Sequence, residues 1–270
     1  MKICVIQMNS QDDKDANLEQ AGRVMRDAVE ATRPDLVALP ELFSYLGGTV
    51  DGARQAAETV PDGPTGELLR TIATSYGVFV YGGSMAERDG DRYYNTTLVF
   101  DPSGALIARY RKIHMFDVVT PDGKVFRESA TYTPGEDIVT FDLNGITVGA
   151  TICYDLRFAE LYTALAKAGA KIIFAPSAFT LMTGKDHWEV LCRARAIETQ
   201  CYFVAPNQTG PYVEDGVDRA SFGNSMIVDP WGTVIGRARE GIGFFAADLD
   251  FDYQTRVRAD LPSLKNRVLG

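Results

Sequence analysis

Three side chains of complementary chemistry each follow an apolar run of the sequence. They are Glu41, Lys112 and Cys153, which come after the runs at 36–40, 105–111 and 146–152. A cysteine thiolate is a nucleophile, and a carboxylate can take the thiol proton as general base and return it to a leaving amine. A lysine ammonium nearby favours the thiolate and stabilises the oxyanion that forms on attack. Together these residue types predict a nucleophilic triad without histidine.

Cys153 stands where a β-branched apolar run, 146–152, passes into a helical pattern. In open α/β sheets ligands bind beyond the carboxyl ends of the strands, and a helix N-terminus favours a thiolate. The backbone N–H of Tyr154 could then be a second oxyanion donor beside Lys112. Taken singly, Cys153 could also be a small buried residue of the core. Glu41 or Lys112 alone could be a charged residue of a solvent-exposed loop. The three together at strand ends favour a site.

The elements that would position these residues alternate between strands and helices. In the first half we expect a helix at 16–31, a helix with Thr65 as its N-cap, and strands at 36–39, 78–85, 93–100 and 105–110, the last two as a hairpin. In the second half we expect helices at 159–168 and 187–200 and strands at 146–152, 172–175, 202–205, 221–228 and 244–247.

This alternation predicts an α/β fold. Two sheets, each with helices on one side, would pack face to face as a four-layer α-β-β-α sandwich. The helix at 187–200 is expected to bury one face formed by Val190, Leu191, Ala194 and Ile197. The 270 residues, 46% hydrophobic and 23% charged, suit a single domain over 1–270.

The charge balance restricts the possible binding partners, and the cysteine pattern indicates the cellular compartment. A net charge of −9 argues against nucleic acid or an anionic membrane as partner, but it leaves room for an anionic substrate held by local cations. No stretch is long enough for a membrane helix, and the N-terminal run is too short for a signal peptide. Four scattered cysteines without CxxC spacing read as free thiols of a cytoplasmic protein. The Asn-x-Thr sequences at Asn95 and Asn207 therefore carry no weight as glycosylation signals.

Only two histidines occur, His114 and His187, so a histidine-rich metal site is excluded. We expect no metal and no cofactor. A cysteine–histidine hydrolase would have to pair Cys153 with one of these two residues, and this alternative predicts that the lysine at 112 is dispensable.

The sequence resembles the nitrilase superfamily of carbon–nitrogen hydrolases. The resemblance lies in three motifs, Pro40-Glu41-Leu42-Phe43, the segment 110–114 around Lys112, and the segment 152–158 around Cys153, and it extends from residue 2 to about residue 266. It implies the four-layer fold, a dimer or higher homo-oligomer, and a catalytic triad of Glu41, Lys112 and Cys153. The auxiliary carboxylate of the family corresponds to Glu128. Two carboxylates near one thiol would raise the pKa of one of them, which suits proton exchange.

One stretch is similar to the branch that contains deaminated-glutathione amidase and omega-amidase, and closer to the former. It covers 176–202, with the run 193–202, Arg-Ala-Arg-Ala-Ile-Glu-Thr-Gln-Cys-Tyr, as its most specific part. The resemblance implies a substrate that is a 2-oxo acid ending in an amide. Arg157 would bind its carboxylate, helped by the backbone of Phe179 and the hydroxyl of Thr183. A guanidinium binds a carboxylate with two parallel hydrogen bonds, which fixes the distance to the amide.

The sequence thus predicts a metal-free cysteine amidase that forms a thioester on Cys153. Its partner would be a small carboxylate-bearing amide, with no nucleic acid and no membrane. Alternatives are an omega-amidase on 2-oxoglutaramate, a general aliphatic amidase, a nitrilase, a carbamoyl amidohydrolase, or a silent scaffold. The run 154–157, Tyr-Asp-Leu-Arg, argues against a true nitrilase, where Trp-Glu is typical. Arg157 could instead pair with Asp155 or Glu160. Loops at 44–51 and 210–219 would shape the substrate end of the pocket.

Overall fold

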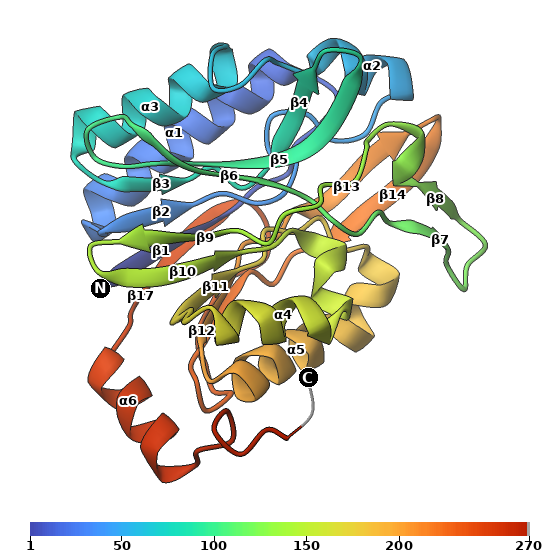
Figure 1. Cartoon of the computed structure of the whole chain (residues 1–270). Helices are drawn as coiled ribbons and strands as arrows, with labels where there is room; N and C mark the ends of the chain where they lie inside the picture. The colour runs from blue at the N-terminus through green and yellow to red at the C-terminus, as the bar shows by residue number, and fades with distance from the viewer. Residues whose placement is uncertain (269–270) are drawn as a thin grey trace.

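The computed structural model describes residues 1–268 and has four layers (Figure 1). Two sheets lie face to face in the middle, helices α1 and α3 cover one outer side, and helices α4 and α5 cover the other. This confirms the predicted α-β-β-α sandwich.

The first sheet has seven strands in the order β17-β1-β2-β3-β5-β4, with β6 also paired to β5. Its strands are β1 (Lys2–Gln7), β2 (Leu36–Ala38), β3 (Phe79–Tyr81), β4 (Met85–Asp89), β5 (Arg92–Phe100), β6 (Leu106–Arg111) and β17 (Gly243–Asp248). Its helices are α1 (Lys14–Thr32), α2 (Val50–Ala56) and α3 (Pro64–Tyr76). Successive side chains of a strand point to opposite faces, so Ile3 and Val5 join the core between the sheets while Cys4 and Ile6 pack under α1 and α3.

The second sheet has the order β16-β15-β12-β11-β10-β9. Its strands are β9 (Thr140–Leu143), β10 (Ile146–Ala150), β11 (Ile172–Phe174), β12 (Tyr202–Ala205), β15 (Met226–Val228) and β16 (Val234–Arg237), and its helices are α4 (Ala159–Lys167) and α5 (Leu181–Thr199). A last helix, α6 (Phe251–Asp260), follows β17. The sheets meet at side chains such as Tyr81 and Phe174, whose rings stack with centroids 4.2 Å apart.

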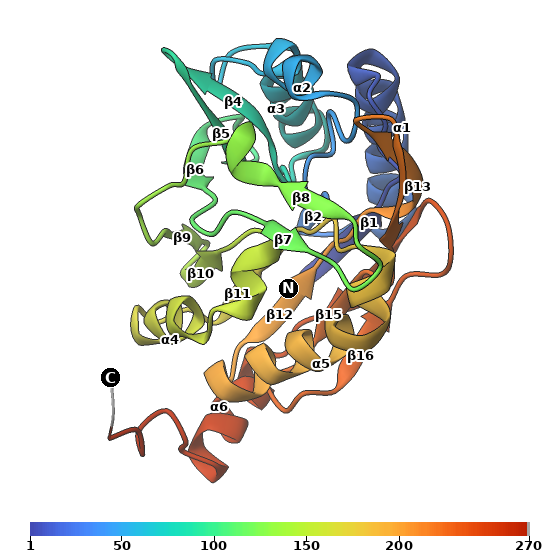
Figure 2. The same ribbon diagram turned by 90° about the vertical axis from the view of Figure 1, so that its right-hand side faces the viewer.

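Two hairpins stand apart from both sheets and lie at one end of the sandwich (Figure 2). One pairs β7 (Asp117–Val119) with β8 (Val125–Arg127) and leads into a 3₁₀ turn, η1 (Glu128–Ala130). The other pairs β13 (Thr209–Glu214) with β14 (Val217–Phe222). A further 3₁₀ turn, η2 (Cys153–Arg157), separates β10 from α4. The hairpins and η2 are the parts of the fold that surround the candidate site.

Two predicted strands are each interrupted by residues with positive φ. The strand expected at 78–85 is broken between β3 and β4, where Gly83 has a φ of 50°. The strand expected at 221–228 is broken between β14 and β15, where Gly223 and Asn224 have φ values of 69° and 56°. These left-handed residues turn the chain, which an apolar pattern alone does not reveal.

Two helix predictions also need correction. Thr65 is not an N-cap, because α3 begins at Pro64 with Gly63 as its cap, and the Thr65 hydroxyl binds Glu58 instead. Helix α5 begins at Leu181 and not at the predicted His187. It leaves Val190 66% exposed, and Ile197 is also largely exposed, while it buries Trp188, Cys192, Arg195 and Ala196. The predicted apolar face was therefore wrong for Val190 and Ile197, whereas Leu191 does pack against the core.

Candidate active site

Glu41 lies just after β2, in a turn that is fixed by the break between β3 and β4. A Cβ at Gly83 would overlap the Pro40 carbonyl, so only glycine allows this close approach. The side chain of Glu41 is buried, and its Oε2 accepts a hydrogen bond from the Ala178 N–H at 2.8 Å. Its Oε1 accepts one from Lys112 Nζ at 2.9 Å. The turn thus aims a carboxylate at the lysine expected to lie near it.

Lys112 follows β6 directly and is 1% exposed. Its Nζ lies 2.9 Å from Glu41 Oε1 and 2.8 Å from Glu128 Oε2. Burial alone would lower the pKa of the ammonium, but the carboxylates of Glu128 and Glu41 outweigh burial, and the pKa of Lys112 is raised well above its usual value. Lys112 is therefore a permanent cation between two acids.

Glu128 opens the turn η1 and is the third member of this cluster. Its Oε2 accepts a hydrogen bond from the Phe116 N–H at 2.7 Å, in addition to the bonds from Lys112. Burial raises its pKa, the charge of Glu41 raises it further, and Lys112 opposes both effects. A carboxyl group with a raised pKa is suited to carry a proton to and from a substrate.

Asn95, on β5, joins the two carboxylates. Its Nδ2 donates to Glu41 Oε1 at 2.9 Å and to Glu128 Oε1 at 3.1 Å. Sequence reasoning missed this residue, because an asparagine inside an apolar strand showed only an Asn-x-Thr pattern. The signal that could have found it is that a buried amide needs polar partners.

Cys153 is the first residue of η2 and has a φ of 46°, in the left-handed region. Its N–H donates to the Pro176 carbonyl at 2.9 Å, which ties the turn to the end of β11. Burial raises the pKa of the thiol well above its usual value, Glu41 raises it further, and Lys112 opposes them. The Tyr154 N–H has no hydrogen-bond partner among residues 1–268, so an oxyanion donor is free next to the sulfur.

The turn that carries Cys153 is held from behind by a fully buried carboxylate. Asp155 Oδ2 accepts hydrogen bonds from the Tyr110 hydroxyl at 2.6 Å and from the Ile152 N–H at 2.8 Å. Its Oδ1 lies 2.7 Å from His114 Nδ1. Asp155 is thereby engaged on both oxygens, so it does not pair with Arg157, and the described residues show no ion pair of Arg157 with Glu160 either.

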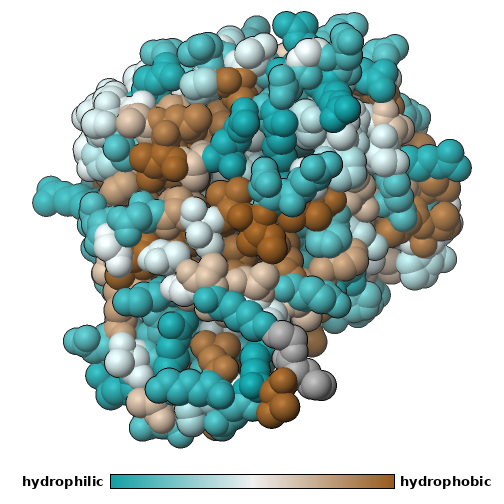
Figure 3. All heavy atoms as spheres, viewed as in Figure 1, coloured by the Kyte–Doolittle hydropathy of each residue, from teal (hydrophilic) through white to brown (hydrophobic). Residues whose placement is uncertain are grey.

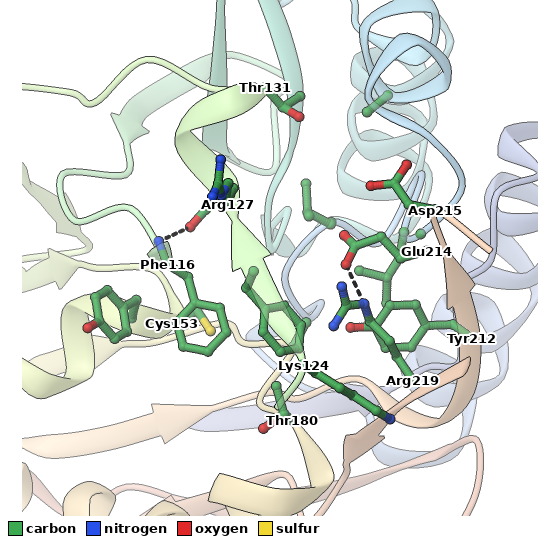
Figure 4. Close-up of a pocket in the computed structure, with 18 of the residues that line it drawn as sticks. Phe116, Lys124, Arg127, Thr131, Cys153, Thr180, Tyr212, Glu214, Asp215 and Arg219 are labelled. Carbon is green, nitrogen blue, oxygen red and sulfur yellow. Dashed lines mark hydrogen bonds and ion pairs between the residues drawn. The ribbon is translucent and has the colours of Figure 1, made fainter. Parts of the chain in front are cut away.

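These groups open into a cavity of about 680 Å³ that Glu41, Lys112, Glu128 and Cys153 line together. Figure 4 shows Cys153 on one side of this cavity and Tyr212, Glu214 and Arg219 from the β13–β14 hairpin on the other. Its lining includes apolar side chains as well, among them Phe116, just before β7, and Phe126 of β8. The three predicted triad residues and the auxiliary carboxylate are therefore brought to one place.

Arg157 also lines the cavity, at the end of η2. Its guanidinium carbon lies 5.3 Å from the ring centroid of Phe179 and 5.9 Å from that of Tyr154. Its Nη1 lies 3.3 Å from His187 Nδ1, which places His187 beside the arginine. With no carboxylate paired to it among residues 1–268, the guanidinium is free to bind an anion in the cavity.

The two other residues predicted to bind substrate differ: Thr183 lines the cavity, whereas the backbone of Phe179 is already hydrogen-bonded. Thr183, in the first turn of α5, lines the cavity, and its hydroxyl lies 2.9 Å from that of Thr180. Phe179 lines it as well, but its N–H donates to Asn207 Oδ1 and its carbonyl accepts from the Phe222 N–H. The Phe179 backbone is thus already paired, and its ring is the part that faces Arg157. Asn207 is the second asparagine whose role the sequence did not show.

Neither histidine takes a position beside the thiol. The His114 ring stacks on that of Phe158 with centroids 3.7 Å apart and contacts Asp155, while His187 contacts Arg157. No group of three or more His, Cys, Asp or Glu side chains within residues 1–268 is arranged to hold a metal ion. In the same part of the chain, no helix has the length and apolarity needed to cross a membrane.

The profile of the carbon–nitrogen hydrolase family matches residues 2–259. The chain belongs to this family. The carbon–nitrogen hydrolase is 40% identical over 269 residues to a deaminated glutathione amidase of Synechocystis sp., covering 97% of this chain and 96% of that relative. It is 36% identical over 266 residues to an omega-amidase of Mus musculus, covering 98% and 94% of the two chains.

Solved structures agree with this assignment. Nit3 of Saccharomyces cerevisiae, described as a member of branch 10 of the nitrilase superfamily, superposes with a TM-score of 0.89 at 31% identity and covers 100% of this chain and 97% of its own. The amidase of Nesterenkonia sp. AN1, with acrylamide added to its active-site cysteine, gives a TM-score of 0.76 at 26% identity, covering 97% and 98%. The resemblance to the nitrilase superfamily is confirmed, and the protein is a hydrolase of non-peptide carbon–nitrogen bonds in linear amides.

Proposed function

We propose that this hydrolase is a metal-free cysteine amidase that acts on 2-oxo-acid amides such as deaminated glutathione. The observation that carries the proposal is the convergence of Glu41, Lys112 and Glu128 beside Cys153, with the free guanidinium of Arg157 in the same cavity. The substrate class is supported by the deaminated glutathione amidase of Synechocystis sp., which is 40% identical over nearly the whole chain.

The proposed reaction begins with a protonated thiol, because the pKa of Cys153 is raised. Glu41 takes the thiol proton as the sulfur attacks the amide carbon. The oxyanion is stabilised by the Lys112 ammonium and the Tyr154 N–H. Protonation of the amide nitrogen then breaks the carbon–nitrogen bond, the amine leaves, and a thioester remains on Cys153. Water, deprotonated by a carboxylate, attacks the thioester, and the acid departs as the thiol regains its proton.

Glu128 is proposed to protonate the nitrogen of the departing amine. Burial raises its pKa, which favours the protonated form that a proton donor needs, and Lys112 links it to Glu41 so that the two acids share one cation. Arg157 is proposed to bind the carboxylate of the substrate, with Thr183 as a further donor and the Phe179 ring as the wall behind the guanidinium. Each of these residues thus has a separate proposed role, which a single substitution can test.

Intact-mass spectrometry tests the proposal. Incubation with a 2-oxo-acid amide and hydroxylamine is expected to yield the hydroxamate, and quenched samples are expected to carry the acyl mass on Cys153. Both signals should vanish in Cys153→Ala. A wild-type protein that forms no adduct with any amide would support the scaffold alternative, and a nitrile as the preferred substrate would support a nitrilase.

Omega-amidase activity on 2-oxoglutaramate is the second candidate function. It is favoured by the 36% identity to the omega-amidase of Mus musculus over 98% of this chain. The same triad and the same arginine would serve both reactions, so a panel assay of ammonia and amine release separates them.

We also propose that residues 1–270 form one hydrolase domain, since the family profile spans nearly the whole chain. A homodimer is proposed because apolar side chains reach the surface: α5 exposes Val190 and Ile197, and Figure 3 shows hydrophobic side chains gathered near the middle of the face in view. Light scattering on the purified protein tests this. A cytoplasmic location is proposed from the four free thiols, which suit a reducing compartment.

A further inference from the structure

Three polar residues of the sequence motifs have no part in the proposed reaction. Tyr110 and His114 stand two residues before and two residues after Lys112, and Asp155 stands two residues after Cys153. None of these three side chains lines the cavity. They contact one another instead, and the contacts join the segment of Lys112 to the segment of Cys153.

Asp155 is the centre of these contacts and is fully buried. Its Oδ2 accepts a hydrogen bond from the Tyr110 hydroxyl at 2.6 Å, and its Oδ1 accepts one from the His114 N–H at 3.1 Å. The ring of His114 places Nδ1 2.7 Å from the same Oδ1. A carboxylate only accepts hydrogen bonds, so we assign the proton to Nδ1.

The contacts bridge the two sheets at the point where each sheet supplies a reacting group. Tyr110 lies on β6 of the first sheet, and Asp155 lies in η2, which follows β10 of the second sheet. Because Tyr110 and His114 lie on either side of Lys112 in the chain, the lysine segment is bound to Asp155 at both ends. Burial, and then the charge of Asp155, raise the pKa of Tyr110 well above its usual value, so its hydroxyl remains a donor.

The same carboxylate closes the turn that carries the nucleophile. The Asp155 N–H donates to the Ile152 carbonyl at 3.0 Å, and Asp155 Oδ2 accepts from the Ile152 N–H at 2.8 Å. Cys153, the next residue, has a φ of 46°. A residue with a Cβ keeps such a conformation only where its surroundings hold it there. Asp155 therefore contributes to the direction in which the sulfur points.

A stack of aromatic rings makes a second link between the two segments. The ring of His114 lies on that of Phe158, with centroids 3.7 Å and planes 7° apart. Phe158 ends η2, and its N–H donates to the Asp155 carbonyl at 3.0 Å. The stack fixes the plane of the His114 ring, and this keeps Nδ1 directed at Asp155.

We infer that Tyr110, His114 and Asp155 form a positioning network, which holds the ammonium of Lys112 and the sulfur of Cys153 in the mutual arrangement that attack on the amide requires. The inference rests on the proposed function, because this arrangement matters only if Lys112 stabilises the oxyanion formed by Cys153. None of the three residues touches the substrate, so loss of a contact is expected to lower kcat and to leave KM nearly unchanged.

The experiment removes the partners of Asp155 one at a time, because substitution of Asp155 itself would leave several buried donors unpaired. Tyr110→Phe removes only a hydroxyl. His114→Phe keeps a ring that can stack on Phe158 and removes the Nδ1 donor. His114→Asn is the conservative variant, because its side-chain amide can place a donor where Nδ1 lies.

Tyr202→Phe is the matched control for the loss of a buried hydroxyl. Tyr202 is 2% exposed, its hydroxyl donates to the Asp250 carbonyl at 2.8 Å, and it does not line the cavity. The free energy of unfolding in urea is measured for each variant. Steady-state kcat and KM are measured with deaminated glutathione or 2-oxoglutaramate, whichever the wild type hydrolyses faster.

Tyr110→Phe and His114→Phe are each expected to lower kcat by about five- to 20-fold and to change KM by less than about twofold, since small misplacements of reacting groups slow the chemical step. His114→Asn is expected to keep at least about half of the wild-type kcat. Tyr202→Phe is expected to lose stability as Tyr110→Phe does but to keep the wild-type kcat.

A wild-type kcat in Tyr110→Phe or in His114→Phe would overturn the inference. An equal loss of kcat in Tyr202→Phe, or an effect on KM alone, would overturn it as well, because a general loss of stability or of substrate binding would then account for the result. In each of these cases the wild type remains active. A wild type that forms no thioester with any amide would instead overturn the proposed function.

Discussion

Lys112 Nζ lies 2.9 Å from Glu41 Oε1, and both side chains are almost completely withdrawn from solvent. A buried charge is tolerated only when it is paired, so each of these residues depends on the other for its charge state. The second carboxylate, Glu128, binds the same ammonium. Burial, with the charge of Glu41 next, raises the pKa of Cys153 although an ammonium is near.

Lys112→Met is expected to lower kcat/KM by more than about 100-fold, because the oxyanion loses its cationic donor. Far-UV circular dichroism is expected to match the wild type. The substitution leaves two buried carboxylates side by side, and protonation relieves their repulsion. The stability of this variant to urea is therefore expected to be lower at pH 8 than at pH 5. Wild-type turnover in Lys112→Met would exclude the triad.

Alkylation of Cys153 by iodoacetamide is expected to be slow at pH 7 and to accelerate as the pH rises. A raised pKa means that the neutral thiol dominates at pH 7, and only the thiolate reacts quickly. The rate is measured by intact mass, with Cys153→Ala as the control for the other thiols. A rate already at its plateau at pH 7 would show a preformed thiolate and would remove the need for a general base.

Arg157→Ala is expected to raise KM for 2-oxo-acid amides by about 10- to 100-fold, since a charge-assisted pair contributes about 1.5–3 kcal/mol. Neutral amides are expected to show a much smaller change. Arg157→Lys keeps the charge but not the two parallel hydrogen bonds. Its KM for 2-oxo-acid amides is therefore expected to lie between that of the wild type and that of Arg157→Ala. Steady-state kinetics with matched charged and neutral substrates decide the question. An equal rise for both classes would take Arg157 out of substrate binding.

Asn95→Leu is expected to lower kcat by about tenfold or more, because Glu41 and Glu128 lose a shared donor worth about 1 kcal/mol to each. The pKa of Glu128 is expected to rise further, and because Glu128 is the proposed proton donor, the alkaline limb of the pH–rate profile moves to higher pH. The profile is measured from pH 5 to pH 9. An unchanged profile would show that the amide of Asn95 is only a spacer in β5.

The sequence predicted the layers and the motif residues because both depend on local patterns. Glu41 and Lys112 each follow a strand of the first sheet and Cys153 follows β10 of the second, and the packed sheets bring these strand ends to one cavity. Asn95 and Asn207 could not be found in this way. One sits within β5 and the other follows β12, and their roles depend on hydrogen bonds to residues distant in the chain, Glu41 and Phe179 respectively.

The prediction of which face of α5 is buried failed for a different reason. The helix has apolar residues on more than one face, so periodicity could not decide which face is buried. It buries Arg195, which pairs with Glu198 and donates to the Leu156 carbonyl, and this polar contact holds the helix against η2. Val190 and Ile197 are left outside as a result.

The two attachments of the β13–β14 hairpin have a consequence for how such enzymes diversify. Its root is bound to the Glu41 carbonyl through Gln208, whereas its outer part is bound to the loop at Gly48 and to Lys124. Residues between these anchor points can therefore be exchanged during evolution, or by an engineer, without disturbing bond cleavage. A single catalytic centre could in this way act on new amide substrates after substitutions in one short surface segment.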